Sequence, residues 1–187
     1  MAKKALVLLA DGFEDVEAVT PVDYLRRAGI EVSTVSISES LTVTSKWGGI
    51  KMIACVTLSE IFKHGTESWD AVILPGGMPG AANLAASKET GAFIKDMSAN
   101  GKLVCAICAA PALVLAPLGL LAGKNFTCYP GMEEKVNGGS WSDASVVTDG
   151  NIITSRGAGT AGKFSVAVIE KLLDKATAQK IADAVLL

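Results

Sequence analysis

The sequence is poor in histidine, in aromatic residues and in long apolar runs. It holds one histidine, His64, and tryptophan, tyrosine and phenylalanine together make up 5% of its 187 residues. No apolar run approaches the roughly 20 residues that a membrane span needs. The net charge of −2 creates no basic field to attract nucleic acid or an anionic membrane. We therefore exclude membrane-spanning and nucleic-acid-binding proteins.

Metal and cofactor sites also lack the residues they need. No histidine and cysteine cluster stands at ligand spacing, so we expect no metal centre. The glycine-rich segment 76–80 is not followed by the Gly-Lys-Ser/Thr of a phosphate loop and does not fit the dinucleotide fingerprint. We expect no nucleotide and no other cofactor.

Export signals are absent as well. The apolar run 5–10 is too short for a signal peptide and leads straight into Asp11 and Gly12, as a first strand does. Four cysteines without export features indicate reduced thiols, and hence a cytoplasmic protein. They stand at positions 55, 105, 108 and 128.

Half of the residues are hydrophobic and strand patterns alternate with helix patterns along the chain. This alternation predicts a single α/β domain over residues 1–187, with a doubly wound, mostly parallel sheet and helices on both faces. The expected strands are 5–10, 31–37, 71–74, 103–107, 125–129, 145–148 and 152–155, with a β excursion at 41–45 and 50–55. The expected helices are 14–28, 57–63, a stretch before Asn100, one after Cys108, and 159 to the end with a break near 175–176.

Cys108 stands where the buried strand 103–107 meets a helix that has a proline in its first turn. At such a joint the free N–H groups and the helix dipole favour negative charge. They are expected to lower the thiol pKa and to hold an oxyanion. The alternative interpretation is one more buried, inert cysteine. No histidine follows Cys108, which argues against the cysteine and histidine pair of class I glutamine amidotransferases. His64 is expected at the end of a short helix, away from this joint.

Loops 11–17, 75–80 and 107–111 all follow strands, so they are expected to meet at the carboxyl edge of the sheet, where such folds bind ligands. There the Glu17 carboxyl can hydrogen-bond the Cys108 sulfur and move a proton. The N–H groups of Gly76 and Gly77 can complete an anion hole. The alternatives are a solvated carboxylate at a helix start, and ordinary loop glycines.

Cys105 and Cys108 have the spacing of a redox pair, but three strand steps are expected to put their side chains on opposite faces. A dithiol switch is therefore the weaker interpretation.

Four segments resemble the ThiJ/PfpI superfamily, and most of all its parkinsonism-associated deglycase (DJ-one) branch. They are ADGFEDVEAV (10–19), VILPGG (72–77), LVCAICAAP (103–111) and TSRGAGT (154–160). The resemblance implies a flavodoxin-like fold, a homodimer, a reactive Cys108 with Glu17 as its partner, and an oxyanion pocket from the backbone of Gly76, Gly77 and Ala109.

The resemblance also implies an activity that needs no metal or organic cofactor. Such proteins convert methylglyoxal or glyoxal to hydroxy acids (glyoxalase III) or act on early glycation adducts (deglycase). Redox sensing and chaperone-like protection are the alternative. We expect the enzyme, acting through a hemithioacetal on Cys108, and keep as the alternative a stress protein whose Cys108 is oxidised to the sulfinate without turnover.

Three positions depart from the family's pattern. Tyr129 stands where this branch usually has a histidine, and a phenol is a poor base near neutral pH. Ala109 stands where protease relatives have a histidine, which argues against proteolysis. Ala158 replaces a common proline in the loop after Arg156. Tyr129 and Arg156 are the further pocket candidates.

Overall fold

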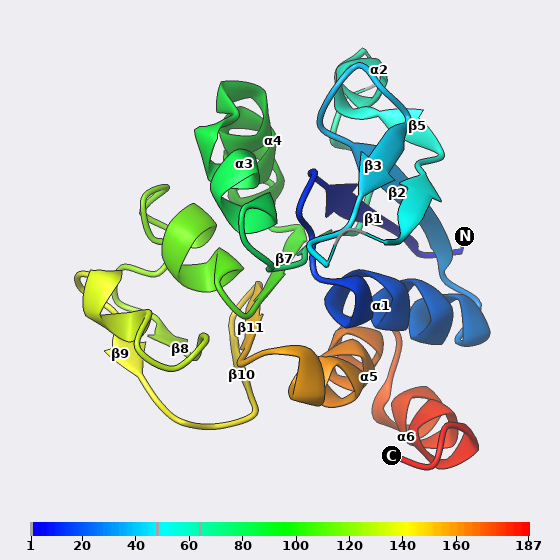
Figure 1. The fold of residues 1–187 in the computed structure, drawn as a ribbon. Coiled ribbons are helices and arrows are strands. Elements are labelled where there is room, and N and C mark those ends of the chain that lie inside the picture. Colours follow the sequence, from blue (N-terminus) through cyan, green and yellow to red (C-terminus); the bar gives the residue numbers. More distant parts are fainter. Residues whose placement is uncertain (1, 48, 64) are drawn as a thin grey trace.

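The computed structural model describes residues 2–47, 49–63 and 65–187. His64, and Gly48 in the expected link of the β excursion, lie outside the described residues. Seven strands form one sheet in the order β10-β11-β7-β6-β1-β2-β5, and β10 alone is antiparallel to its neighbour (Figure 1). Their bounds are β1 Lys4–Leu9, β2 Glu31–Ser36, β5 Val56–Thr57, β6 Ala71–Leu74, β7 Leu103–Ile107, β10 Val146–Asp149 and β11 Ile152–Ser155.

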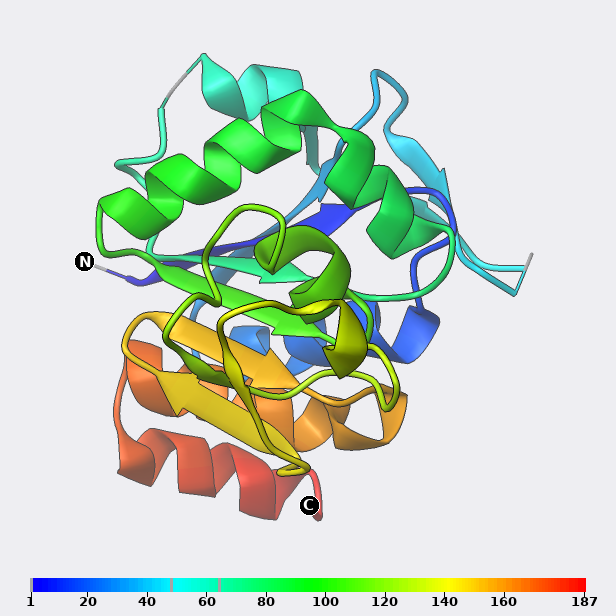
Figure 2. The same cartoon turned by 90° about the vertical axis from the view of Figure 1, so that its left-hand side faces the viewer.

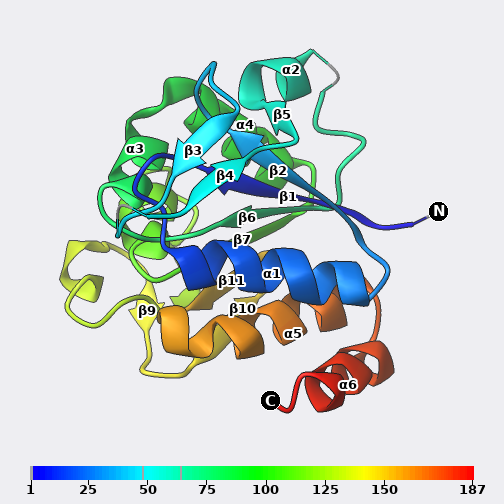
Figure 3. The same ribbon diagram turned by 45° about the vertical axis from the view of Figure 1, so that its right-hand side comes forward.

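Helices cover both faces of this sheet. On one face lie α1 (Asp15–Arg27) and α5 (Ala161–Leu172), with α6 (Lys175–Ala184) outside them (Figure 3). On the other lie α2 (Leu58–Phe62), α3 (Gly80–Ala86) and α4 (Lys88–Ala99) (Figure 2). Two small sheets flank the main one: β3 (Thr42–Thr44) with β4 (Lys51–Ile53), and β8 (Asn125–Phe126) with β9 (Ser140–Trp141). This is the predicted α/β flavodoxin-like fold.

The continuous apolar strands are explained by the two helical layers. In β1 the side chains of Ala5, Val7 and Leu9 pack into the cluster under α1 and α5. Leu6 and Leu8 pack into the cluster under α2 and α4 on the opposite face. Both faces of such a strand are buried, so successive residues are all apolar instead of alternating with polar ones.

A helix follows Cys108, as expected, but it is a short π-helix, η1 (Pro111–Leu115), and hydrogen-bonded turns follow it. The Ala116 N–H bonds to the Pro111 carbonyl five residues back, at 3.0 Å. Pro117 has no N–H to continue an α-helical ladder, and Gly119 turns the chain with φ +79°.

Helix α1 turns a different stripe to the sheet from the one expected. The sequence suggested that Val16, Val19 and Val22 face the sheet, but Val16 and Val19 are 46% and 45% exposed. The buried stripe is Glu17, Ala18, Pro21, Val22 and Leu25. Pro21 lies inside this segment and predicts a kink or a late helix start. The helix nevertheless begins at Asp15 and runs through Pro21.

Two further expectations need correction. The strand expected over 125–129 is confined to Asn125–Phe126 in β8, and the break between the last two helices lies just before Lys175. Among the described residues, the helices are all too short or too polar to span a bilayer.

Candidate functional site

The site forms where four neighbouring parallel strands end. In the sheet order β11-β7-β6-β1, each strand is followed at its carboxyl end by a loop that contributes to the site. Strand β7 leads directly into Cys108, which has φ +64°, a left-handed conformation that non-glycine residues seldom adopt. Its backbone is fixed by the Cys108 N–H, which donates to the Ser155 carbonyl at the end of β11 at 2.9 Å. The sharp turn interrupts the strand and leaves the thiol half-buried.

Glu17 is the buried carboxyl of the site. It lies in the first turn of α1 with 1% of its surface exposed, and its Oε2 accepts a hydrogen bond from the Gly76 N–H at 2.8 Å. Burial raises the pKa of Glu17 from 4.5 to about 7, and the nearby charge of Glu14 acts in the same direction. The bonds from Gly76 and Cys108 and the charge of Lys46 oppose this without cancelling it. Near neutral pH this carboxyl can therefore either hold or release a proton.

The Cys108 thiol differs from expectation in its acidity. The N–H groups of Gly77 and Ala109 hydrogen-bond the sulfur and lower the thiol pKa, as the sequence suggested. Burial, the charge of Glu17 and the hydrogen bond to Glu17 outweigh them and raise the pKa of Cys108 to about 12. Glu17 therefore ionises before Cys108, and a Cys108 thiolate is favoured only when Glu17 is protonated.

The Gly76 N–H is not free for an oxyanion, because it donates to Glu17. The second contribution of Gly76 to the site is steric, because it has no side chain. A Cβ there would lie 2.7 Å from both Cys108 Cβ and Glu17 Oε2, so only glycine lets these two side chains meet. At Gly77, with φ +90°, a Cβ would lie 2.5 Å from the Glu14 nitrogen. Gly77 and Ala109 remain as the donors beside the sulfur.

Of the two further pocket candidates, the structure brings one to the site. The Tyr129 N–H donates to the Cys108 carbonyl at 2.8 Å, and its ring lies beside Gly157, near Glu17. Tyr129 is 53% exposed and so stands at the mouth of the site. The Arg156 guanidinium instead donates to the Asp143 carbonyl at 2.9 Å.

The other cysteines are placed apart from this chemistry. All four lie among the described residues and are free, with Cys105 and Cys128 buried and Cys55 exposed. Burial raises the pKa of Cys128 to about 12 and that of Cys105 well above its ordinary value. Cys108 packs against the cluster that contains Cys105, so the expected opposite faces are wrong, because the left-handed turn ends the strand alternation.

Sequence reasoning missed two contributors. Lys46, whose charge acts on Glu17, is brought near by the β3–β4 excursion, and its N–H donates to the Phe13 carbonyl at 2.8 Å. Gly157, just beyond β11, lies between Tyr129 and Glu17. Nothing in the local sequence marks Lys46, but a glycine two residues after a buried strand was a usable signal for Gly157.

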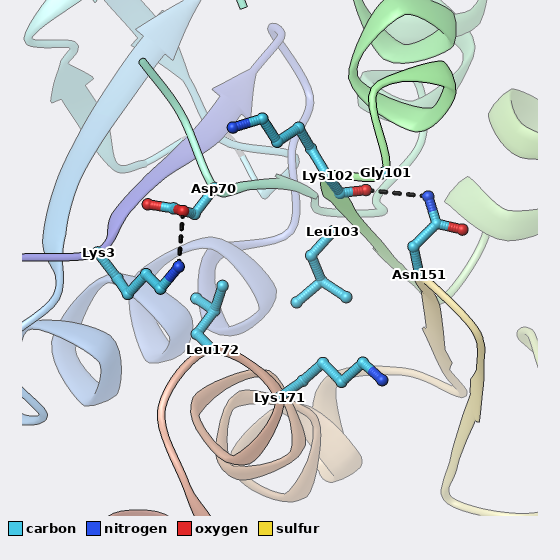
Figure 4. A pocket seen from close by; sticks show the side chains of 8 residues that line it. All are labelled: Lys3, Asp70, Gly101, Lys102, Leu103, Asn151, Lys171 and Leu172. Carbon is cyan, nitrogen blue, oxygen red and sulfur yellow. Dashed lines mark hydrogen bonds and ion pairs between the residues drawn. The ribbon is translucent and has the colours of Figure 1, made fainter. Parts of the chain in front are cut away.

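A separate pocket of about 190 Å³ lies at the opposite edge of the sheet (Figure 4). Most of its lining residues precede or begin strands β1, β6, β7 and β11, while Lys171 and Leu172 come from the end of α5. The Lys3–Asp70 ion pair of 2.9 Å lies on one side. This is the amino edge of the parallel strands, away from Cys108. Within the described ranges, groups of three or more histidine, cysteine, aspartate or glutamate side chains suited to a metal ion are absent.

Comparison with known proteins places this geometry in a family. The model of the DJ-1/PfpI family matches residues 3–171. Drosophila melanogaster dj-1beta is 38% identical over 188 residues, covering 100% of this chain and 98% of that protein. Its crystal structure superposes with a TM-score of 0.93 at 37% identity, covering 100% and 99% of the two chains.

Two further relatives differ in length and in name. Arabidopsis thaliana DJ-1 homolog B is 41% identical over 182 residues, which cover 96% of this chain but only 40% of that protein. A Caenorhabditis elegans relative named glutathione-independent glyoxalase DJR-1.2 is 32% identical over 173 residues, covering 91% of this chain and 89% of its own length. The match over nearly the whole length, in both sequence and fold, makes this chain a member of the DJ-1/PfpI family.

Proposed function

We propose that the protein is a cysteine-dependent glyoxalase that converts small 2-oxoaldehydes, such as methylglyoxal, to hydroxy acids without glutathione. The observation that carries this is the pair of Cys108 and Glu17, whose side chains are hydrogen-bonded to each other beside two backbone donors to the sulfur. The name of the Caenorhabditis elegans relative supports the same reaction class. Deglycase action on early glycation adducts would begin with the same sulfur and the same carbonyl chemistry.

The reaction begins when the Glu17 carboxylate takes the proton of the Cys108 thiol and the sulfur adds to the aldehyde carbon. A carbon–sulfur bond forms and the carbonyl π electrons move to oxygen, where the N–H groups of Gly77 and Ala109 are positioned to stabilise the charge. Glu17 then gives its proton to this oxygen, which completes a hemithioacetal. This leaves Glu17 as a carboxylate, ready to act as a base.

The second stage is an internal redox reaction that needs no outside oxidant. Glu17 removes the proton from the former aldehyde carbon, which gives an enediolate with its negative charge on the former ketone oxygen. The hydroxyl proton of the first carbon passes to that oxygen, and Glu17 returns the carbon-bound proton to the former ketone carbon. The first carbon is thereby oxidised to a thioester and the second reduced to an alcohol. Water then cleaves the thioester and releases lactate and the thiol. Oε1 is the oxygen available for these transfers, because Oε2 is bonded to Gly76.

The direct test is formation of lactate from methylglyoxal by the purified protein. Cys108→Ser is expected to abolish lactate formation. Cys55→Ser is the matched control, because this exposed thiol lies on another edge of the sheet and is expected to keep the wild-type rate. Absence of lactate from the wild type, or full activity in Cys108→Ser, would contradict the proposal.

A second candidate function is redox sensing, in which peroxide oxidises Cys108 to the sulfinate. It is favoured by the surroundings of an oxidised sulfur and not by the acidity of the thiol, whose pKa is about 12. Two N–H donors and a carboxyl able to carry a proton lie beside the half-buried sulfur and could stabilise a sulfinate. Intact mass spectrometry after mild peroxide treatment should show two added oxygens on Cys108 before any other cysteine. Equal oxidation of all four cysteines would argue against it.

We also propose a homodimer. Val16 and Val19 form an exposed apolar stripe on α1, and Ile53 of the neighbouring β4 is 77% exposed. The tip of the β3–β4 excursion is joined to the start of α1, because Trp47 Nε1 donates a hydrogen bond to Glu14 Oε2 at 3.3 Å. These apolar side chains therefore lie on one side of the molecule, and a second copy would bury them.

A further inference from the structure

One side of the Cys108–Glu17 pair is closed by close packing. The virtual Cβ of Gly76 would overlap both side chains, and that of Gly77 would lie 2.5 Å from the Gly12 carbonyl. Neither glycine therefore has space beside it for any group of a substrate. A substrate must approach the pair from another direction.

The opposite side, at Gly157, is packed more loosely. A Cβ built on Gly157 would lie 3.7 Å from the Tyr129 ring and 3.9 Å from Glu17 Oε1, which are ordinary van der Waals contacts. Because Gly157 has no side chain, a space is left beside Glu17 Oε1, the oxygen that is not bonded to Gly76, and the methyl group of an alanine at 157 would occupy it.

The walls of this space are fixed by contacts outside the reaction. The Thr160 N–H donates to the Gly157 carbonyl at 2.8 Å, and the Gly157 N–H donates to Thr160 Oγ1 at 3.1 Å. Tyr129 is held by its N–H bond to the Cys108 carbonyl. The space is consequently part of the folded site.

We infer that Gly157 determines specificity: the space over its α-carbon, which no side chain of residue 157 covers, lies beside Tyr129 and Glu17 and receives the substituent R of a 2-oxoaldehyde R–CO–CHO. This inference takes its substrate class from the proposed function. The substituent is bonded to the carbon to which Glu17 returns the proton. It is therefore expected to lie close to Glu17 Oε1, in the space over Gly157. An alanine at 157 would fill that space with its own methyl group.

The test uses alkylation, because it reports on the space even if turnover is absent. Chloroacetaldehyde, chloroacetone and phenacyl chloride alkylate a thiol to give S–CH₂–CO–R, with hydrogen, methyl or phenyl as R, which mimics the hemithioacetal skeleton. Gly157→Ala is expected to leave the Cys108 rate with chloroacetaldehyde within about twofold. It is expected to slow chloroacetone and phenacyl chloride by about tenfold or more, the usual effect of one methyl group in a filled pocket.

Gly159→Ala is the matched control, because it lies in the same loop and a Cβ there meets no atom within 4 Å. It should leave all three rates unchanged. The conformation of Gly157, with φ 166°, is extended and accepts alanine, and a melting curve checks the fold. Tyr129→Ala removes the other wall and should speed phenacyl chloride relative to chloroacetaldehyde, so it decides the matter if Gly157→Ala does not fold.

Turnover gives the second readout. In an active enzyme, Gly157→Ala should raise the ratio of kcat/KM for glyoxal to that for methylglyoxal by about tenfold. If Gly157→Ala slows the alkylation of Cys108 by all three agents equally, Gly157 does not determine specificity, whether or not the protein produces lactate. A size-dependent alkylation with no lactate from the wild type would instead confirm the space and contradict the proposed reaction.

Discussion

The carboxyl of Glu17 and the N–H of Gly76 form a buried hydrogen bond of 2.8 Å between residues 59 positions apart. This bond fixes one carboxyl oxygen against the loop after β6 and leaves the other beside Gly157. The same loop supplies the Gly77 N–H that reaches the Cys108 sulfur. The acid, the nucleophile and a backbone donor are thus held by one short segment.

Glu17→Gln is expected to eliminate dicarbonyl turnover while leaving Cys108 alkylation within about tenfold, or about 1.4 kcal/mol, of wild type. The amide oxygen can still accept the Gly76 bond, but an amide cannot carry the proton. Iodoacetamide kinetics and lactate formation, measured on the same preparations, separate the two effects. Retained turnover in this variant would show that another group moves the proton.

The stability of the protein should depend on pH through Glu17. Its pKa is 4.5 in the unfolded chain and about 7 in the folded protein, so the folded protein binds more protons between these values. The contribution of Glu17 to stability is therefore present below about pH 4.5 and is lost as the pH rises through about 7. Relative to Glu17→Gln, the wild type should lose roughly 3 kcal/mol over this window, at about 1.4 kcal/mol per unit.

Urea unfolding of the wild type and of Glu17→Gln at about pH 5 and about pH 8 measures this loss. The quantity of interest is the change with pH in the difference between their free energies of unfolding. Groups that do not interact with Glu17 titrate alike in both proteins and cancel, and in the wild type Cys108 stays a thiol at both pH values because its pKa is about 12. A difference in unfolding free energy that does not change with pH would contradict the raised pKa of Glu17.

Gly76→Ala should destabilise the protein by about 1–3 kcal/mol and suppress turnover, because the new methyl group would collide with Cys108 and Glu17. Gly159→Ala serves as the control, since its Cβ would point into open space. Thermal unfolding and lactate formation are the measurements. A fully active Gly76→Ala enzyme would be incompatible with the packing described for this loop.

Tyr129→Phe is expected to lower turnover far less than Glu17→Gln does. The phenol lies at the mouth of the site and can orient a carbonyl, but it is a poor base at neutral pH. Tyr129→His should raise turnover, if the histidine usual in this branch of the family assists. If Tyr129→Phe were as inactive as Glu17→Gln, Tyr129 and not Glu17 alone would carry the proton.

The double variant Val16→Asp and Val19→Asp is expected to produce monomers of about 19 kDa in sedimentation velocity. The wild type should sediment at twice this mass. The exposed polar pair Asp23 and Arg27 on the same helix offers a control, since exchanging the two residues keeps the charge. A wild-type monomer at micromolar concentration would remove the proposed dimer.

The sheet and its site edge were predictable because buried parallel strands have a simple signature. The continuous apolar runs 71–74 and 103–107 could only lie between two helical layers, and this placed Cys108 and Gly76 at adjacent strand ends. The chain order of the loops then brought Glu17 to the same edge. The π-helical hydrogen bonding of the helix after Cys108 could not be predicted. Its residues favour a helix locally, but Pro111, Pro117 and Gly119 decide which hydrogen bonds form.

The acidity of Cys108 was not predictable from its position at a turn. Backbone donors act as expected, but the depth of burial and the proximity of Glu17 reverse the net direction of the pKa shift. Both depend on the packing of the first turn of α1 against the loop after β6. Lys46 was missed for a similar reason, since its approach depends on contacts between the β3–β4 excursion and the loop at Phe13.

The left-handed backbone conformation of Cys108 implies a compromise between the stability of the fold and the chemistry of the site. A non-glycine residue in this conformation costs about 1–2 kcal/mol, which glycine would avoid. The fold therefore tolerates a less stable turn at the position where it presents sulfur. Selection for thermal robustness alone would favour Cys108→Gly, so the cysteine is expected to disappear from a population of variants chosen only for stability.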